Sequence, residues 1–131
     1  MVTAGIFSLL SQNSSINALI GTRIFPVLLP ERATLPAVTY QVISMKPQYE
    51  LQNRVNVTNL RLQIDAWAET YADAKSAVSA IVAVLDNFSG TLPDSTQVFG
   101  VQLRNSVDYF EHESLTYRVL AEFDIQFAHS S

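Results

Sequence analysis

The chain has 131 residues, of which 48% are apolar and 15% charged, and it contains no cysteine. This length is sufficient for one domain with a sizeable core, and the lack of cysteine excludes disulfides and thiolate metal sites. The net charge of −4 arises entirely after residue 107, where five acidic residues face one arginine, and this sign argues against generic binding to nucleic-acid phosphates.

The N-terminal segment predicts two short helical pieces and then an extended connector. Apolar residues share one face of a helix over residues 3–12, and this run is too short to cross a membrane. Ser14 or Ser15 can cap a second turn, which Gly21 is placed to end. Three prolines then favour an edge strand or a connector over residues 23–36, because proline cannot donate a hydrogen bond to a sheet.

A β-rich segment and a long polar stretch follow. Residues 37–45 predict a strand, in which Ile43 breaks the alternation, as expected if its face is partly covered. Residues 46–57 contain no tight-turn pair such as Asn-Gly, so they do not form a minimal hairpin. We therefore expect a loop over residues 46–57 that is longer than a connection between neighbouring strands requires.

The strongest pattern lies in the middle of the chain. Residues 60–67 alternate between apolar and polar, which predicts a half-buried strand. From Tyr71 to Phe88 the apolar residues recur every three or four positions, which predicts an amphipathic helix. Thr70 and Asp73 have the spacing of a capping box at its start.

Two further strands complete the predicted fold. Residues 99–109 alternate, a polar turn follows over 110–114, and residues 115–127 show the most regular alternation of the chain. The last strand would reach about 43 Å if straight, so it must bend or project. We expect an α+β fold: an antiparallel, possibly mixed, sheet of four to five strands with one long helix across a face and a short N-terminal helix. The expected shared core is Leu62, Ile64, Val78, Ile81, Leu85, Val119, Phe123 and Ile125.

Few residues have the pattern of a catalytic or metal site. His112 lies between Glu111 and Glu113 in the predicted turn, where adjacent side chains point in different directions and a solvated hairpin tip is favoured over a metal site. Asp65 could act as a general base, but pairing across the sheet with an arginine such as Arg118 or Arg104 is favoured, because no second tuned titratable group accompanies it. We expect no enzyme activity, no metal and no cofactor.

Several segments together resemble a known family. They are Gly21-Thr-Arg-Ile-Phe-Pro26, Leu35-Pro-Ala-Val-Thr-Tyr40, residues 61–74 (RLQIDAWAETYADA), Tyr117-Arg118 and Phe123-Asp-Ile125. In order and spacing they resemble the tail-completion, or tail-terminator, proteins of long-tailed bacteriophages, over nearly the whole chain. The 46–57 stretch departs from that pattern, since similar proteins often have a shorter turn with glycine there.

The resemblance implies a structural virion protein without catalytic activity. Such proteins form a ring, usually of six subunits, at the head-proximal end of the tail tube of a siphophage. The ring stops tube polymerisation and joins the tail to the head connector, while DNA passes through its lumen without specific binding. The implied partners are other copies of the chain, the tail tube protein and the connector, with no membrane. The implied location is the virion, and the host cytoplasm before assembly.

For the subunit and tube contacts we select surface residues from the connector, the long loop and the acidic turn. We expect the loop to be mobile in the isolated subunit and to contact a neighbour, and the acidic 108–124 region would suit a lumen. Two alternatives stay open: a small cytoplasmic ligand-binding or regulatory α+β domain, and an enzyme that uses Asp65. The selected interface residues are Phe25, Leu29, Lys46, Tyr49, Leu51, Arg54, Glu111, His112 and Glu113.

Overall fold

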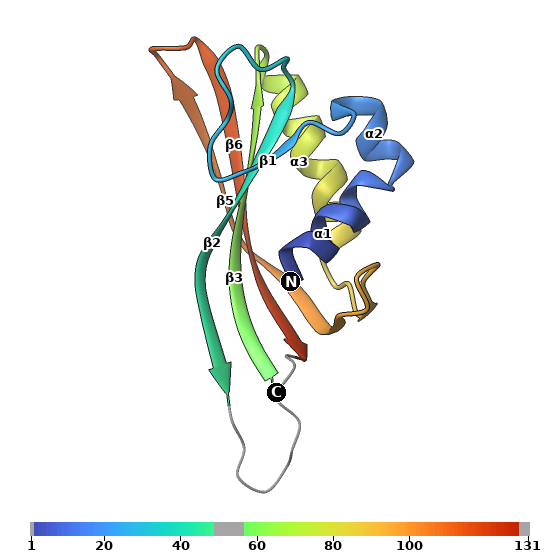
Figure 1. Cartoon of the computed structure of the whole chain (residues 1–131). Coiled ribbons are helices and arrows are strands. Elements are labelled where there is room, and N and C mark those ends of the chain that lie inside the picture. The colour runs from blue at the N-terminus through green and yellow to red at the C-terminus, as the bar shows by residue number, and fades with distance from the viewer. Residues whose placement is uncertain (1, 49–56, 129–131) are drawn as a thin grey trace, which may run out of the picture.

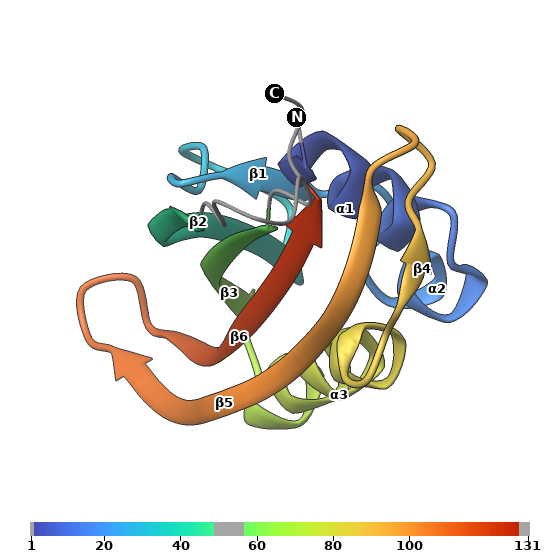
Figure 2. The ribbon, with the colours of Figure 1, turned by 90° about the horizontal axis from the view of Figure 1, so that it is seen from below.

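The computed structural model describes residues 2–48 and 57–128, in which three helices cover one face of a six-stranded sheet (Figure 1). The strand order is β1-β2-β3-β6-β5-β4, and the sheet is curled (Figure 2). The elements in chain order are α1 (Val2–Ser11), α2 (Ser14–Ile20), β1 (Ile24–Pro26), β2 (Ala37–Gln48), β3 (Val57–Ala68), α3 (Tyr71–Leu85), β4 (Gly90–Thr91), β5 (Gln97–Glu111) and β6 (Thr116–Ala128).

The α+β class is confirmed, but the expected number of strands and helices is too low. β1 pairs with β2 in parallel, whereas the other neighbouring pairs are antiparallel, so the sheet is mixed. Sequence periodicity missed β1 and β4 as sheet members because strands of three and two residues are too short to alternate measurably. Of the two alternatives that the prolines left open, an edge strand or a connector, the structure has both: Ile24–Pro26 form the edge strand β1, and an irregular connector follows it.

Local capping explains where the helices begin and end. The side chain of Asn13, rather than Ser14 or Ser15, caps α2 by accepting a hydrogen bond of 3.1 Å from the backbone N–H of Ile16. Thr70 caps α3 in the same way, accepting a bond of 3.2 Å from the N–H of Asp73, as predicted. α3 ends at Leu85, three residues before the predicted end, and Asn87 beyond it has a φ of 64°.

The predicted core between helix and sheet is confirmed. All eight expected residues are buried in one cluster, and α3 packs on β3 and β6. The N-terminal helices extend this core with Ile6, Leu10, Ile16 and Ile20. The apolar stripes of the sheet and of the helices therefore cover one another, as a two-layer fold requires.

Three irregularities in the strand pairing explain the positions where the alternation fails. The register of β2 against β3 shifts between Val42 and Ser44, so Ile43 is a bulge residue and is exposed, not partly covered as expected. β5 shifts against β6 at Phe99 and again at Arg104. At the first of these shifts, Val98 is therefore buried and Phe99 is exposed.

The strands connect two ends of the molecule, about 40 Å apart along β3 for its twelve residues at ~3.3 Å each. The β5–β6 end contains the start of β2, the end of β3 and the turn at residues 112–115 (Figure 1). The β2–β3 end contains Gln48, Val57 and Ala128, which are adjacent in the register. β6 spans this whole length and curves, as its predicted length required (Figures 1 and 2).

Truncating Leu85 tests this packing. Leu85→Ala should lower the free energy of unfolding by about 2–5 kcal/mol, because a buried leucine loses its transfer energy and leaves a cavity. Ser79→Ala, an exposed position on the same helix, is the matched control and should change stability little. Urea unfolding measures both. A loss near zero for Leu85→Ala would contradict the burial of this helix face.

Candidate assembly surface

The face of the sheet opposite the helices is polar, and we call it the open face. Since Leu60, Leu62 and Ile64 point to the helices, the alternate residues of β3 and their partners in β6 point the other way. These positions carry charged and amide side chains in place of the aliphatic ones of the core. Across the two strands they are Asn59, Arg61, Gln63, Asp65, Trp67, Arg118, Leu120, Glu122, Asp124 and Gln126.

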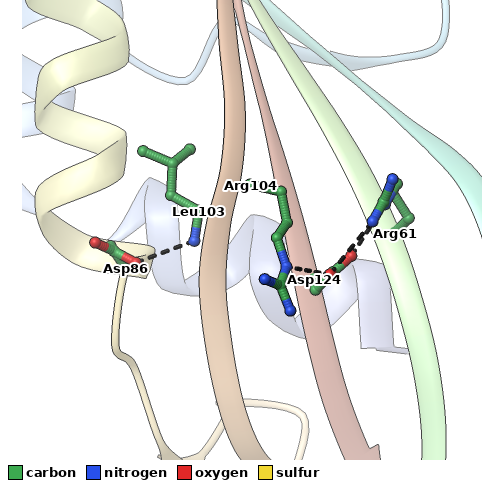
Figure 3. A network of polar contacts seen from close by, with 5 residues as sticks. All are labelled: Arg61, Asp86, Leu103, Arg104 and Asp124. Atoms are coloured by element: carbon green, nitrogen blue, oxygen red, sulfur yellow. Dashed lines mark hydrogen bonds and ion pairs between the residues drawn. The ribbon is translucent and has the colours of Figure 1, made fainter.

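A three-residue ion-pair network crosses the open face (Figure 3). Arg61 donates to both carboxylate oxygens of Asp124 at 3.0 and 3.3 Å, and Arg104 donates to the same carboxylate from the other side. The hydrogen bond from Arg61 is the main reason why the pKa of Asp124 lies below its ordinary value. One carboxylate thus balances two guanidinium groups, which leaves one positive charge in excess.

A hollow of about 490 Å³ lies beside this network, on the open face toward the β2–β3 end. Arg61 and Asp124 form part of its wall, and Ile43 brings its bulged side chain to it. Lys46 also lines the hollow, is exposed, and has no ion pair within the described residues. The hollow is therefore positively charged, with an aliphatic side chain at its border.

A second cluster surrounds Arg118 near the β5–β6 end. Its guanidinium lies 3.6 Å from Asp65 and 3.2 Å from Glu111, and it sits against the rings of Trp67 at 5.3 Å and Tyr109 at 4.6 Å from the centroids. The structural pairing predicted for the carboxylate of Asp65 is confirmed.

Asp65 is only 8% exposed, and this burial affects the pKa of its carboxyl group. Burial raises the pKa of Asp65 above its ordinary value, while the hydrogen bond from Gln63 and the charge of Arg118 act in the opposite direction. Trp67 donates its indole N–H to the hydroxyl of Thr39 at 3.0 Å. The carboxylate and the indole nitrogen thus already have partners within the chain.

The predicted turn residues lie at the tip of the β5–β6 hairpin. Glu111 ends β5 and pairs with Arg118, whereas His112 and Glu113 are exposed in the turn. No group of three or more histidine, aspartate or glutamate side chains in the described ranges could hold a metal ion. Sequence reasoning missed Leu115, which was expected to start the strand but lies in the turn with its side chain 69% exposed.

The connector residues selected from the sequence are less exposed than their neighbours. Phe25 in β1 and Leu29 after it are only partly exposed. Val27 and Leu28 between them are 66% and 77% exposed, so they form the apolar surface of this segment. The proline pattern identified the segment that carries exposed apolar side chains, but it did not identify which of these side chains are exposed.

Of the residues selected from the long loop, the structure describes only Lys46. Residues 46–48 extend β2 and Val57 begins β3, so these ends of the predicted loop belong to paired strands. Tyr49, Leu51 and Arg54 lie outside the described residues. In the part of the chain that is described, no helix is long and apolar enough to cross a membrane.

One comparison with known proteins shows the family of this chain, and another shows its fold. The family model described as "Tail completion protein gp17" matches residues 4–128. A chain of the virion of a native gene transfer agent particle has the same fold, with a TM-score of 0.75 and 14% identity over 98% of this chain and 95% of that one. No curated protein matches the sequence.

The network around Asp124 gives a test of the electrostatics on the open face. Asp124→Asn should lower the free energy of unfolding at neutral pH by about 1 kcal/mol, the scale of partly exposed ion pairs. Because the folded protein lowers the pKa of Asp124, its contribution is complete above the ordinary value of 3.8 and is lost as the pH falls through the lowered value.

Urea unfolding of both proteins at neutral pH and below the lowered pKa measures the difference. The difference in unfolding free energy between the wild-type protein and the variant should vanish at the acidic pH. At neutral pH, high salt should make this difference smaller, because it screens the ion pairs. An equal difference at both pH values would mean that the ionised carboxylate is not its source.

Proposed function

Because this chain belongs to the tail completion protein gp17 family, we propose that it forms a ring at the head-proximal end of a phage tail tube. The family membership confirms the resemblance that the sequence motifs indicated, and it supports a structural role in the phage tail. In the proposed ring, usually of six subunits, the protein stops tube polymerisation and offers the surface that joins the head connector.

The observation that carries self-assembly is the presence of exposed aliphatic side chains at two separate places on the subunit. Leu115 is exposed in the turn at the β5–β6 end, while Ile43 is exposed at the bulge of β2 and lines the hollow on the open face. A closed ring needs a head-to-tail contact, in which one patch fits a different patch of the next copy. A subunit with exposed aliphatic side chains at two separate places meets this requirement.

The charges of the open face are consistent with a lumen through which DNA passes without specific binding. The four bases of this face, Lys46, Arg61, Arg104 and Arg118, equal its four acids, Asp65, Glu111, Glu122 and Asp124. Phosphate binding needs an excess of basic groups that can release counterions. A face with equal numbers of basic and acidic groups is therefore expected to bind the phosphates of passing DNA only weakly.

The acidic 108–124 region is less negative than its sequence indicates, because most of its acids are paired. Asp108 lies 2.9 Å from Lys75, and the ion pairs of Glu111 and Asp124 are described above. We keep this region as a candidate part of the lumen wall, together with the rest of the open face. The proposed location is the virion, at the head–tail junction, after assembly from host cytoplasm.

The ligand-domain alternative has one feature in its favour, the hollow beside Arg61. Its volume of about 490 Å³ lies within the range of small-molecule pockets, about 300–1,000 Å³. Such pockets are mostly apolar with a few polar groups free to orient a ligand. Here the lining is largely polar, and Arg61 and Asp124 already bind one another.

Mass in solution and binding to tubes test the ring. We expect the purified protein to sediment as a closed oligomer of its 14.5 kDa chain, or to do so at high concentration or on tube ends, where it should stop elongation. Complete tails, whose ends are already capped, are the control and should bind none. A strict monomer that binds no tube would overturn the ring and favour the ligand domain.

A further inference from the structure

The turn at residues 112–115 forms the tip of the β5–β6 hairpin, and several contacts link it to the adjoining strands. Ser114 and Thr116 share a hydrogen bond of 2.6 Å, and Glu111 is tied to Arg118 at 3.2 Å. The ring of Phe110 packs edge-on against His112 at 5.0 Å and Tyr117 at 4.9 Å between centroids. A tip held in this way loses little conformational entropy when it binds, which favours affinity.

Leu115 has an unfavourable backbone conformation, and its exposed side chain brings the isolated subunit little stability in return. Its φ of 52° lies in the left-handed region, where a bulky side chain is strained, and the side chain is 69% exposed. An exposed leucine contributes little to the core, while its left-handed backbone conformation is unfavourable for a residue with a bulky side chain. Glycine would fit this backbone better, so the leucine needs another explanation.

The hollow on the open face complements this tip in charge and in apolarity. Lys46 supplies an unpaired positive charge within the described residues, while Arg61 and Asp124 in the same lining pair with one another. Ile43, 45% exposed at the bulge, supplies an aliphatic contact at the border. Glu113 and Leu115 of the turn are the matching carboxylate and aliphatic side chain.

We propose that the 112–115 turn of one copy docks into the hollow of the next copy, with Glu113 beside Lys46 and Leu115 against Ile43. This contact rests on the proposed ring, for which it identifies both sides of the subunit interface. The turn lies at the β5–β6 end and the hollow toward the β2–β3 end, so a chain does not fill its own hollow (Figure 1). Each copy therefore gives one turn and receives another.

Reversing the two charges tests the pairing. Glu113→Lys and Lys46→Glu should each weaken self-association at least about tenfold, because each places like charges in contact. The double variant Glu113→Lys with Lys46→Glu should recover most of the loss. Glu69→Lys, an exposed glutamate near the same end but outside the turn, is the matched control and should associate normally.

Sedimentation equilibrium, or occupancy of tube ends if rings form only there, measures these effects. Single variants that associate normally would overturn the docking, and so would a double variant that stays as weak as the singles. In either case a wild-type protein that still forms rings would leave the proposed function standing. A wild-type protein that neither associates nor binds tubes would overturn both.

Leu115→Gly separates assembly from folding. The glycine removes the aliphatic contact and the strain together, so we expect a melting temperature that is unchanged or raised and an association at least about tenfold weaker. Circular dichroism follows the melting and sedimentation follows the association. A lowered melting temperature, or unchanged association, would show that Leu115 serves the fold of the subunit and not the contact.

Discussion

The pairing of β3 with β6 fixes both faces of the sheet, and the rest of the molecule depends on it. The two strands pair without a register shift from Val57 and Ala128 to Ala68 and Tyr117. This register sets Leu62 beside Phe123 under the helices and Arg61 beside Asp124 on the open face. A slip by one residue would turn the apolar side chains outward and bury the charges. Core packing and the polar network thus select the same register.

The flanking strands are less regular, and their irregularities supply the unusual features of the open face. The bulge in β2 exposes Ile43 at the border of the hollow, and the second bulge in β5 brings Arg104 to the carboxylate of Asp124. Bulges re-aim side chains where a regular ladder would alternate them, and they recur near functional sites. The regular central pair, β3 and β6, fixes the core. The bulged strands beside it, β2 and β5, change which side chains reach the surface.

The sequence predicts the parts of this fold that repeat with a period. The stripes of β3, β6 and α3 identify the elements and the shared core, because burial of one face imposes a period of 2 or 3.6 residues. The same reasoning cannot detect β1 or β4, which are too short, and it mistakes the bulge at Ile43 for a covered face. It also assigns Leu115 to a strand, since the alternation continues into the turn.

Site residues are harder to predict, because an interface depends on exposure rather than on residue type. Arg118 could be proposed as a partner of Asp65 from charge alone. Its position between the rings of Trp67 and Tyr109 follows only from the cross-strand register. In the connector, the sequence selects Phe25 and Leu29 as apolar residues of a proline-rich segment, while the backbone turns Val27 and Leu28 to the surface. Sequence therefore identifies the segments of the candidate surface, and the fold decides which side chains reach solvent.

The stability of the subunit and the assembly proposed for it depend on separate residues. The buried cluster beneath the helices accounts for folding, whereas Leu115 and Ile43 are exposed and contribute little to it. Single exposed aliphatic residues do not form a large contiguous apolar surface. They therefore favour little non-specific association, and binding requires that two complementary sites meet. The ion pairs of the open face act in the same direction, since a charge that is already paired attracts fewer wrong partners. In the proposed assembly, such a subunit would present two different sites to its neighbours without drawing on the residues of its core.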